Sequence, residues 1–168
     1  MDFISQIELT QKTFLELGCG SGIISLYASQ KGAKVTASDI NKTALEYLTK
    51  ASEENELPVT CVYSNLFENI KEKGFDYIII NPPYYPKSPE NVKQQAWFCG
   101  EGFEYFESLF KQLPSYLSEE NITYMILSED CELEKIKSIA LKNKIIMELI
   151  FEIKKMAEKN FIFSIYQK

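Results

Sequence analysis

The chain has 168 residues, of which 45% are hydrophobic, and its 18 lysines and 24 acidic residues give a net charge of −6. Because it contains neither histidine nor arginine, the composition excludes Ser-His-Asp and Cys-His catalysis and argues against unaided nucleic-acid binding. No apolar run approaches the ~20 residues that a membrane span needs, so the sequence predicts one compact domain over residues 1–168.

The first half of the chain alternates buried apolar runs with amphipathic stretches, which is typical of a parallel sheet covered by helices. We expect three strands and two helices in this half. They are a strand at Thr13–Leu17, a helix at Gly22–Lys31, a strand at Lys34–Ser38, a helix capped by Asn41 and a strand at Val59–Tyr63.

The second half begins with a nearly continuous apolar strand at Phe75–Ile80, which is expected to be central. A long loop with four prolines follows, from Asn81 to about Gly100, and loops of this length are usually functional or mobile. The remaining elements are a helix at Glu101–Leu117 that is interrupted by Pro114, a strand at Ile122–Leu127, a helix at Glu132–Asn143, and strands at Ile145–Ile153 and Phe161–Tyr166 around a polar turn, Lys154–Asn160.

The whole pattern predicts an α/β fold. We expect a Rossmann-like, doubly wound, seven-stranded and mostly parallel sheet with a C-terminal antiparallel hairpin. In such a sheet, ligands bind at the carboxyl ends of the strands, so the loops after the first, second and fourth strands are the candidate sites.

A glycine-rich segment, Glu16-Leu17-Gly18-Cys19-Gly20-Ser21-Gly22, follows the first predicted strand. Its glycines let the backbone turn sharply and approach a ligand, and it leads into a helix N-terminus with free amides. The third glycine comes one position too early for the dinucleotide fingerprint, and the Lys-Ser/Thr ending of a phosphate-binding loop is absent. The segment therefore predicts a site for a compact nucleoside; the alternative is a purely structural strand–helix turn.

Asp39 ends the second predicted strand, about twenty residues after the glycines. A carboxylate at this position accepts hydrogen bonds from both ribose hydroxyls of an adenosine. Glu16, just before the glycines, is also acidic. We expect it to help hold the amino group of a methionine moiety, through the loop or a water molecule.

The segment Asn81-Pro82-Pro83-Tyr84 directly follows the fourth predicted strand. The prolines fix the backbone and leave the Asn81 side-chain oxygen and a proline carbonyl as rigid acceptors. Accepting both hydrogens of a planar –NH₂ group localises the nitrogen lone pair, and such a transfer depends on positioning more than on a strong base. Tyr84 is placed to stack on the substrate or to close the pocket. The alternative is a strand-terminating turn in which Asn81 caps a free amide.

These motifs resemble a known family. The Glu16–Gly22 segment with Asp39 resembles the cofactor half of class I S-adenosylmethionine-dependent methyltransferases, and the Asn-Pro-Pro-Tyr motif resembles that of enzymes methylating amino groups. Residues Ala96–Gly102 resemble the Trp- and Gly-rich stretch of HemK-type release-factor glutamine N5-methyltransferases, with Cys99 where a glycine is expected. The alternative for Trp97 is a helix start packed in the core.

The resemblance implies S-adenosylmethionine as cofactor, S-adenosylhomocysteine as product and no metal. It places Asn65 and Leu66 against the adenine, although many relatives have an aspartate where this chain has Asn65. The implied catalytic residues are Asn81, Pro82 and Tyr84. The implied cofactor-binding residues are Glu16, Gly18, Gly20, Gly22, Asp39, Ile40, Asn65, Leu66 and Asn81.

The leading hypothesis is an N-methyltransferase that acts on a glutamine side chain in a protein, with a release factor as the best guess. The first alternative is methylation of an exocyclic amino group in RNA or DNA, such as adenine N6. The second is a non-catalytic subunit that binds the cofactor. A lysine-rich surface beside Asn81, including Lys87 and Lys93, would favour nucleic acid, whereas an acidic or apolar groove would favour a protein.

About a dozen residues precede the first predicted strand, whereas the family has a longer N-terminal portion over the cofactor. A more open pocket, a lid supplied by a partner and a different substrate are the alternatives. The resemblance also implies a possible small zinc-binding activator at the sheet edge, which in the usual strand order is Val59–Tyr63. The oligomeric state stays open, and no membrane partner is expected.

The remaining signals concern location and thiols. The N-terminal residues Met1–Gln6 lack a basic region followed by an apolar stretch, which predicts no signal peptide and a cytoplasmic protein. The four cysteines are far apart and form no C-x-x-C pair, so buried thiols are expected rather than a zinc site. They are Cys19, Cys61, Cys99 and Cys131.

Overall fold

The computed structural model describes residues 3–155 and 158–168. The chain divides into two compact units, Met1–Ile79 and Ile80–Lys168, and each is described by itself. Their operation as one domain, which we expect from chain length, stays a prediction. No helix of the described residues is long and apolar enough to cross a membrane. Met1 and Asp2, the start of the segment behind the signal-peptide prediction, lie outside the described residues.

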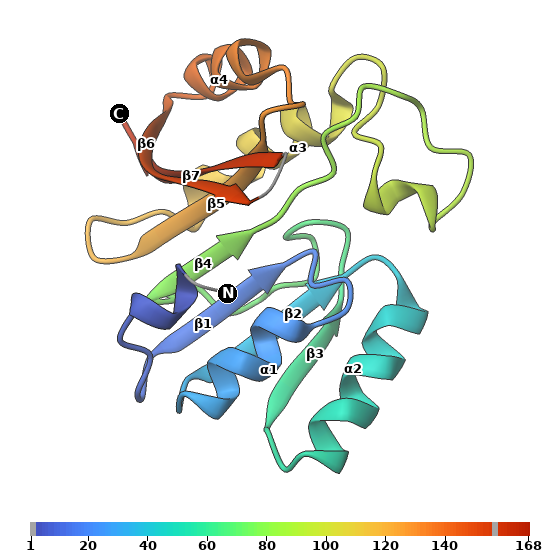
Figure 1. Cartoon of the computed structure of the whole chain (residues 1–168), viewed down its shortest axis with the longest axis vertical. Coiled ribbons are helices and arrows are strands. Elements are labelled where there is room, and N and C mark those ends of the chain that lie inside the picture. Colours follow the sequence, from blue (N-terminus) through green and yellow to red (C-terminus); the bar gives the residue numbers. More distant parts are fainter. Residues whose placement is uncertain (1–2, 156–157) are drawn as a thin grey trace. The chain divides into compact units, whose positions relative to one another are not determined.

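The first unit is built from alternating strands and helices (Figure 1). Strand β2 pairs in parallel with both β1 and β3. Helix α1 packs against β1 and β2, and α2 packs against β2 and β3. The bounds are β1 Thr13–Leu17, α1 Ile23–Gln30, β2 Lys34–Asp39, α2 Lys42–Glu54, β3 Val59–Tyr63 and, leading into the second unit, β4 Tyr77–Ile80.

Helix α2 has the cap and the buried apolar face that its sequence predicts. The Asn41 side-chain oxygen accepts a hydrogen bond from the Thr43 backbone N–H at 3.1 Å, which confirms the predicted cap of α2. Leu45 and Leu48 recur at helical spacing and are buried in one cluster with Cys19 and Ala37. This cluster joins α2 to the glycine segment and to β2, so packing supports the same loop that carries the candidate site.

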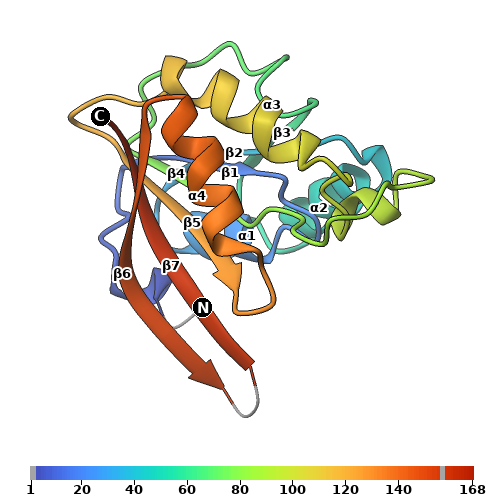
Figure 2. The same cartoon turned by 90° about the horizontal axis from the view of Figure 1, so that it is seen from above.

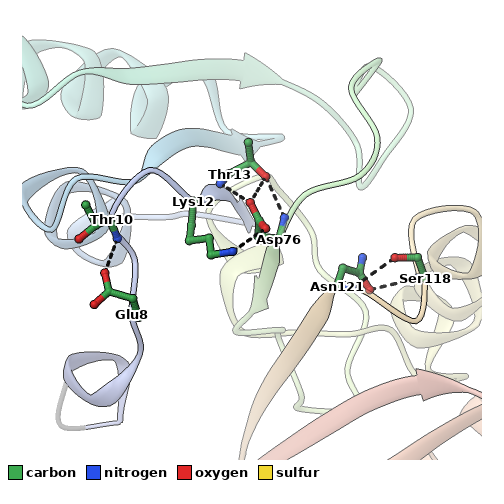
Figure 3. A network of polar contacts seen from close by, with 7 residues as sticks. All are labelled: Glu8, Thr10, Lys12, Thr13, Asp76, Ser118 and Asn121. Atoms are coloured by element: carbon green, nitrogen blue, oxygen red, sulfur yellow. Dashed lines mark hydrogen bonds and ion pairs between the residues drawn. The ribbon is translucent and has the colours of Figure 1, made fainter.

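The start of β4 is clamped to the start of β1 (Figure 3). One carboxylate oxygen of Asp76 accepts hydrogen bonds from the backbone N–H and the hydroxyl of Thr13, both at 2.8 Å. The Thr13 hydroxyl in turn accepts from the Asp76 N–H at 2.8 Å, and Lys12 Nζ lies 3.1 Å from the other carboxylate oxygen. The bonds from Thr13, followed by that from Lys12, lower the pKa of Asp76.

The second unit contains two helices and a three-stranded antiparallel group. Strand β7 lies between β5 and β6 and runs antiparallel to both. Helices α3 and α4 lie side by side, and α4 packs against β6 (Figure 2). The bounds are α3 Glu104–Gln112, β5 Ile122–Ser128, α4 Leu133–Lys142, β6 Ile145–Lys155 and β7 Glu158–Gln167, with short 3-10 turns at Gln94–Ala96 and Leu113–Ser115.

The seven strands found among the described residues follow the order β3-β2-β1-β4-β5-β7-β6. The mixed pairing and the C-terminal antiparallel hairpin confirm the predicted α/β class, and β3 is an edge strand as expected. Three of the cysteines, Cys19, Cys99 and Cys131, are buried free thiols, as predicted, and Cys61 is half-buried.

The predicted bounds of several elements differ from the observed ones by a few residues, and two segments differ more clearly. The helix expected at Glu101–Leu117 begins later, at Glu104, and ends at Gln112, and the interruption expected at Pro114 is a 3-10 turn. The polar turn expected at Lys154–Asn160 lies mostly in strands, since Lys154 pairs with Lys159 and Ile153 with Asn160. Polar side chains at the solvated end of a hairpin do not interrupt its backbone ladder. Residues 156 and 157 lie outside the described residues.

Candidate active site

The glycine segment forms a tight loop between β1 and α1. The backbone N–H groups of Gly18 and Cys19 both donate to the Ser38 carbonyl at 2.9 Å, and Gly22 N–H donates to the Cys19 carbonyl at 2.8 Å. Gly22 has φ +70°, and a Cβ there would collide with the Leu48 side chain of α2. The loop is therefore fastened to the end of β2, and its last position requires a glycine.

Asp39 fastens the same loop with its side chain. One carboxylate oxygen accepts from Gly20 N–H at 2.8 Å, and the other accepts from Asn41 N–H at 2.8 Å. Each carboxylate oxygen can accept a further hydrogen bond, and the residue is only half-buried. Asp39 thus holds the loop and still presents acceptors for a pair of ligand hydroxyls.

Glu16 lies beneath the loop and is buried. One of its carboxylate oxygens accepts from the Ser25 backbone N–H at 2.8 Å and from the Ser25 hydroxyl. Burial raises the pKa of Glu16 to about 7, the bonds from Ser25 oppose the rise, and the negative charge of Asp39 adds to it. Glu16 joins the end of β1 to the first turn of α1, and its contact with a methionine amino group stays a prediction.

The loop after β3 contributes the third part of this region. Asn65 is exposed; its side-chain nitrogen donates to Glu68 Oε1 at 2.9 Å, which leaves its oxygen as an acceptor. Leu66 follows with φ +50°, and its carbonyl accepts from the Ser64 hydroxyl at 2.7 Å. Ser64 N–H donates to the Asp39 carbonyl at 3.0 Å, so this turn is tied to the end of β2.

The first unit therefore brings together eight of the predicted cofactor-binding residues at the carboxyl ends of β1, β2 and β3. Apart from the adjacent residues in the chain, no heavy atom of the described residues lies within 4 Å of a Cβ built on Gly18 or Gly20, so there is space beside the loop at these two positions. Acceptor oxygens of Asp39 and Asn65 match the donors of an adenosine, its ribose hydroxyls and its amino group. These residues fit S-adenosylmethionine. They are Glu16, Gly18, Gly20, Gly22, Asp39, Ile40, Asn65 and Leu66.

The Asn-Pro-Pro-Tyr segment lies in the second unit. Asn81 is exposed, and its side chain makes no hydrogen bond with any residue in the described ranges, in contrast to the capping alternative. Tyr84 is half-buried, and its hydroxyl interacts with the side chains of Tyr85 and Ser128. Burial, followed by the interaction with Tyr85, raises the pKa of Tyr84 to about 12. Tyr84 is thus a neutral donor at physiological pH.

A cavity of about 300 Å³ opens beside this segment, within the second unit. Residues of β5 and β7 form the floor of the cavity, which is partly apolar and partly polar. Residues of the loop after β4 form its wall. Its size lies at the lower end of the range for small-molecule sites. The lining residues are Asn81, Pro82, Pro83, Tyr84, Ala96, Trp97, Ile126, Leu127, Ser128 and Asn160.

The loop after β4 is folded back on itself, which fixes this wall. Tyr85 N–H donates to the Trp97 carbonyl at 3.0 Å, and Cys99 N–H donates to the Tyr85 carbonyl at 2.9 Å. Gly100 N–H donates to the Lys87 carbonyl at 3.1 Å. The Trp97 side chain is 61% exposed, so the alternative that it packs in the core is wrong. It lines the cavity instead, where its ring can contact a substrate.

Two acidic residues adjoin the floor of the cavity in the sequence. Glu129 and Asp130 directly follow the lining residue Ser128, and Glu129 Oε1 accepts from Lys159 N–H at 2.9 Å. Lys159 Nζ lies 2.7 Å from Glu152, which offsets its charge. Lys87 lies over the Phe98 ring, 5.3 Å from its centroid, and does not line the cavity. Lys93, the other lysine named in the prediction, does not line the cavity either.

Sequence reasoning missed the floor of the cavity. Ser128 directly follows the strand predicted at Ile122–Leu127, and the rule that ligands bind at carboxyl ends of strands was sufficient to identify it as a candidate. Asn160 gave no such signal, because it was assigned to a turn. Only the β5–β7 register, which places Asn160 opposite Ser128, brings it to the cavity.

Comparison with known proteins adds three findings. Residues 3–167 match the family described as methyltransferase small domain. A Methanocaldococcus jannaschii protein, provisionally named a protein N5-glutamine methyltransferase, is 32% identical over 83% of this chain and 75% of its own length. The ribosomal RNA small subunit methyltransferase C of Haemophilus influenzae is 33% identical over 77% of this chain, which spans only 41% of that protein.

Among solved structures, the T. thermophilus 16S rRNA N2 G1207 methyltransferase in complex with AdoMet and guanosine has a TM-score of 0.64. The match covers 94% of this chain and 38% of that one, at 17% identity. At this level of identity, the likeness shows a shared fold alone.

Proposed function

Because the chain belongs to the methyltransferase small domain family and is an S-adenosylmethionine-dependent methyltransferase, we propose that it methylates the amide nitrogen of a glutamine side chain in a protein. The proposal places it with the HemK-type enzymes, and a release factor is the substrate we expect. We further propose that it acts in the cytoplasm and that a small activator protein binds at β3, the edge strand of the first unit.

The first unit supplies the binding groups for the cofactor. Asp39 accepts hydrogen bonds from the ribose hydroxyls, and Asn65 accepts one from the adenine amino group. Gly18 and Gly20 leave room for the ligand against the loop backbone. When bound, S-adenosylmethionine supplies a methyl group activated by its attachment to a positively charged sulfur.

Asn81 carries the proposal, because its side-chain amide is uncommitted at the wall of the cavity. The Asn81 side-chain oxygen and a carbonyl of the following prolines accept the two hydrogens of the substrate –NH₂ group. This holds the amide nitrogen with its lone pair out of conjugation and fixed in direction. The nitrogen gains a methyl group and loses one of its two protons to water. No imidazole is needed, in keeping with a chain without histidine.

Two observations favour a protein over a nucleic acid as substrate. The acidic residues Glu129 and Asp130 follow the cavity floor and would repel a phosphate backbone. The chain also spans 75% of the provisional glutamine methyltransferase but only 41% of the ribosomal RNA enzyme, so the similarity to the former extends over more of the whole protein.

The test is transfer of labelled methyl from S-adenosylmethionine to purified release factor, to total cellular protein and to total cellular RNA and DNA. Wild type is compared with Asn81→Ala. Asn91→Ala is the matched control, because Asn91 belongs to the same loop and is exposed but does not line the cavity. We expect label in a protein, on glutamine, with wild type and Asn91→Ala but not with Asn81→Ala. The absence of label in protein would overturn the proposal.

The exocyclic amino group of an RNA base is the second candidate. The exposed Trp97 ring at the cavity wall is a surface on which a base can stack, and relatives in the same family are named for ribosomal RNA. Label that enters RNA and disappears with Asn81→Ala would establish this candidate in place of glutamine.

A further inference from the structure

The cavity of the second unit has two side-chain amides in its wall, Asn81 and Asn160. Asn160 lies on β7, where it is paired with Ser128 of β5 on one side and Ile153 of β6 on the other. Strands on both sides thus hold its backbone in place. Its side chain is half-buried and makes no hydrogen bond with any residue that the structure describes. Asn160 is therefore a preformed group that is free to bind a ligand.

The two hydroxyl groups of the cavity are already engaged. The Ser128 hydroxyl accepts from Asp130 N–H at 3.2 Å and interacts with Tyr84. Tyr84 in turn interacts with Tyr85. Ile126 and Leu127 offer only apolar side chains between them. Asn160 is thus the uncommitted donor on the strand side of the cavity, as Asn81 is the uncommitted acceptor on the loop side.

A primary amide has three hydrogen-bonding requirements: two N–H donors and one carbonyl acceptor. Asn81 and a proline carbonyl serve the two donors, which leaves the carbonyl of the substrate without a partner. We propose that Asn160 is a second substrate-binding residue, whose side-chain nitrogen donates a hydrogen bond to the carbonyl oxygen of the glutamine that Asn81 orients. This inference rests on the proposed glutamine substrate and names the residue that recognises the rest of its amide.

The arrangement selects for a carboxamide. A glutamate has no N–H to offer Asn81, and its charge faces two acceptor oxygens there. A lysine has no carbonyl for Asn160. A site that pairs both ends of an amide rejects side chains lacking either end, because its own polar groups are then left unpaired. Trp97 and the prolines contribute contact area that does not distinguish these side chains.

The experiment compares wild type, Asn160→Ala and Asn160→Asp with the protein substrate that shows Asn81-dependent labelling. Ser164→Ala is the control, because Ser164 is a half-buried polar residue of the same strand outside the cavity. The measurements are kcat and KM for the protein substrate, the dissociation constant of S-adenosylmethionine by calorimetry, and the midpoint of thermal unfolding.

We expect Asn160→Ala to raise KM about 10-fold, as for loss of one neutral hydrogen bond, with a smaller change in kcat. Asn160→Asp should raise KM by about 100-fold relative to wild type, because the negatively charged carboxylate would repel the carbonyl oxygen of the substrate. Cofactor affinity and the unfolding midpoint should match those of Ser164→Ala. An unchanged KM in Asn160→Ala, or a loss of cofactor affinity or stability equal to the loss of activity, would overturn the inference.

The failure of the inference is distinguishable from that of the proposed function. If wild type labels a glutamine and Asn160→Ala labels it with the same KM, the glutamine substrate stands and the role of Asn160 is refuted. If wild type labels RNA and no protein, both the substrate and the amide recognition by Asn160 are refuted.

Discussion

The glycine loop of the first unit and the cavity of the second are built on opposite principles. In the loop, the functional groups bind one another: Asp39 holds Gly20, and Glu16 holds Ser25. In the cavity, Asn81 and Asn160 have no partner among the described residues. The glycine loop is therefore held in shape by its own hydrogen bonds, whereas the cavity has side-chain amides that are free to bind a ligand. Substitutions in the loop should therefore affect stability and cofactor affinity together, and those in the cavity should affect kcat or KM for the substrate without changing either stability or cofactor affinity.

The largest expected effect comes from the uncommitted amide Asn81. Asn81→Ala should lower kcat by about 100- to 1000-fold, as for the loss of a group that acts mainly in the transition state, and leave cofactor affinity within about twofold. Single-turnover kinetics and calorimetry measure the two quantities, with Asn91→Ala as control. Equal losses of turnover and cofactor affinity would remove the distinction between the two regions.

Gly22 and Gly18 test how tightly the loop is built. Gly22→Ala should lower the free energy of unfolding by about 3 kcal/mol, because a Cβ collides with Leu48 at a left-handed backbone position. Gly18→Ala meets no neighbour and should cost only about 1 kcal/mol, from its φ of +72°. Urea unfolding of both variants measures the difference. Equal losses of unfolding free energy in the two variants would show that the Leu48 side chain moves aside for the added methyl group.

Asp39 combines loop support with ligand binding. Asp39→Ala should weaken S-adenosylmethionine binding by about 1.5–3 kcal/mol, the range for hydrogen bonds to a charged group. Glu46→Ala, an exposed acidic residue of α2, is the charge-matched control. Calorimetry with both variants measures the effect, and normal binding by Asp39→Ala would refute its contact with the ribose.

The smallest effect concerns the proton on Glu16. Its folded-state pKa of about 7 lies above the 4.5 of a solvated glutamate, so its stabilising contribution is complete below pH 4.5 and declines as pH rises toward 7. Glu16→Gln lacks this titration. The unfolding free energy of wild type relative to the variant should therefore fall by about 2 kcal/mol between pH 5 and pH 7.5. If the unfolding free energies of wild type and Glu16→Gln changed in parallel with pH, the pKa of Glu16 would not be raised and its carboxylate would be charged in the folded protein over this range.

The same contrast between the regions explains what the sequence could predict. The glycine segment and Asp39 are separated by one helix and one strand, α1 and β2, so their spacing is visible along the chain. Strands Thr13–Leu17 and Val59–Tyr63 were predicted with their observed bounds, because both are short apolar runs between turn residues. The cavity floor was not predictable in this way, since Ser128 and Asn160 meet only through the register of two antiparallel strands.

Trp97 shows a second limit of local patterns. An aromatic residue beside glycines fits either a helix start in the core or a loop at a binding site. The choice depends on the backbone bonds from Tyr85 to Trp97 and from Cys99 to Tyr85, which fold the loop back and leave the ring exposed. Backbone hydrogen bonds of this kind do not require particular side chains, so they cannot be recognised in the sequence. The local sequence is therefore compatible with both surroundings of Trp97 and does not decide between them.

The clamp of Asp76 on Lys12 and Thr13 has a consequence for how this protein can vary during evolution. The contacts of Asp76 with Lys12 and Thr13 fix the residue at which β4 begins. This position does not depend on the length of the exposed segment 71–74 that precedes it. Insertions and deletions between Lys71 and Gly74 should therefore accumulate among descendants without harm. A single added residue between Tyr77 and Ile80 would turn Asn81 to the opposite face of the strand and end the activity. Length variation in this lineage should stop abruptly at Asp76.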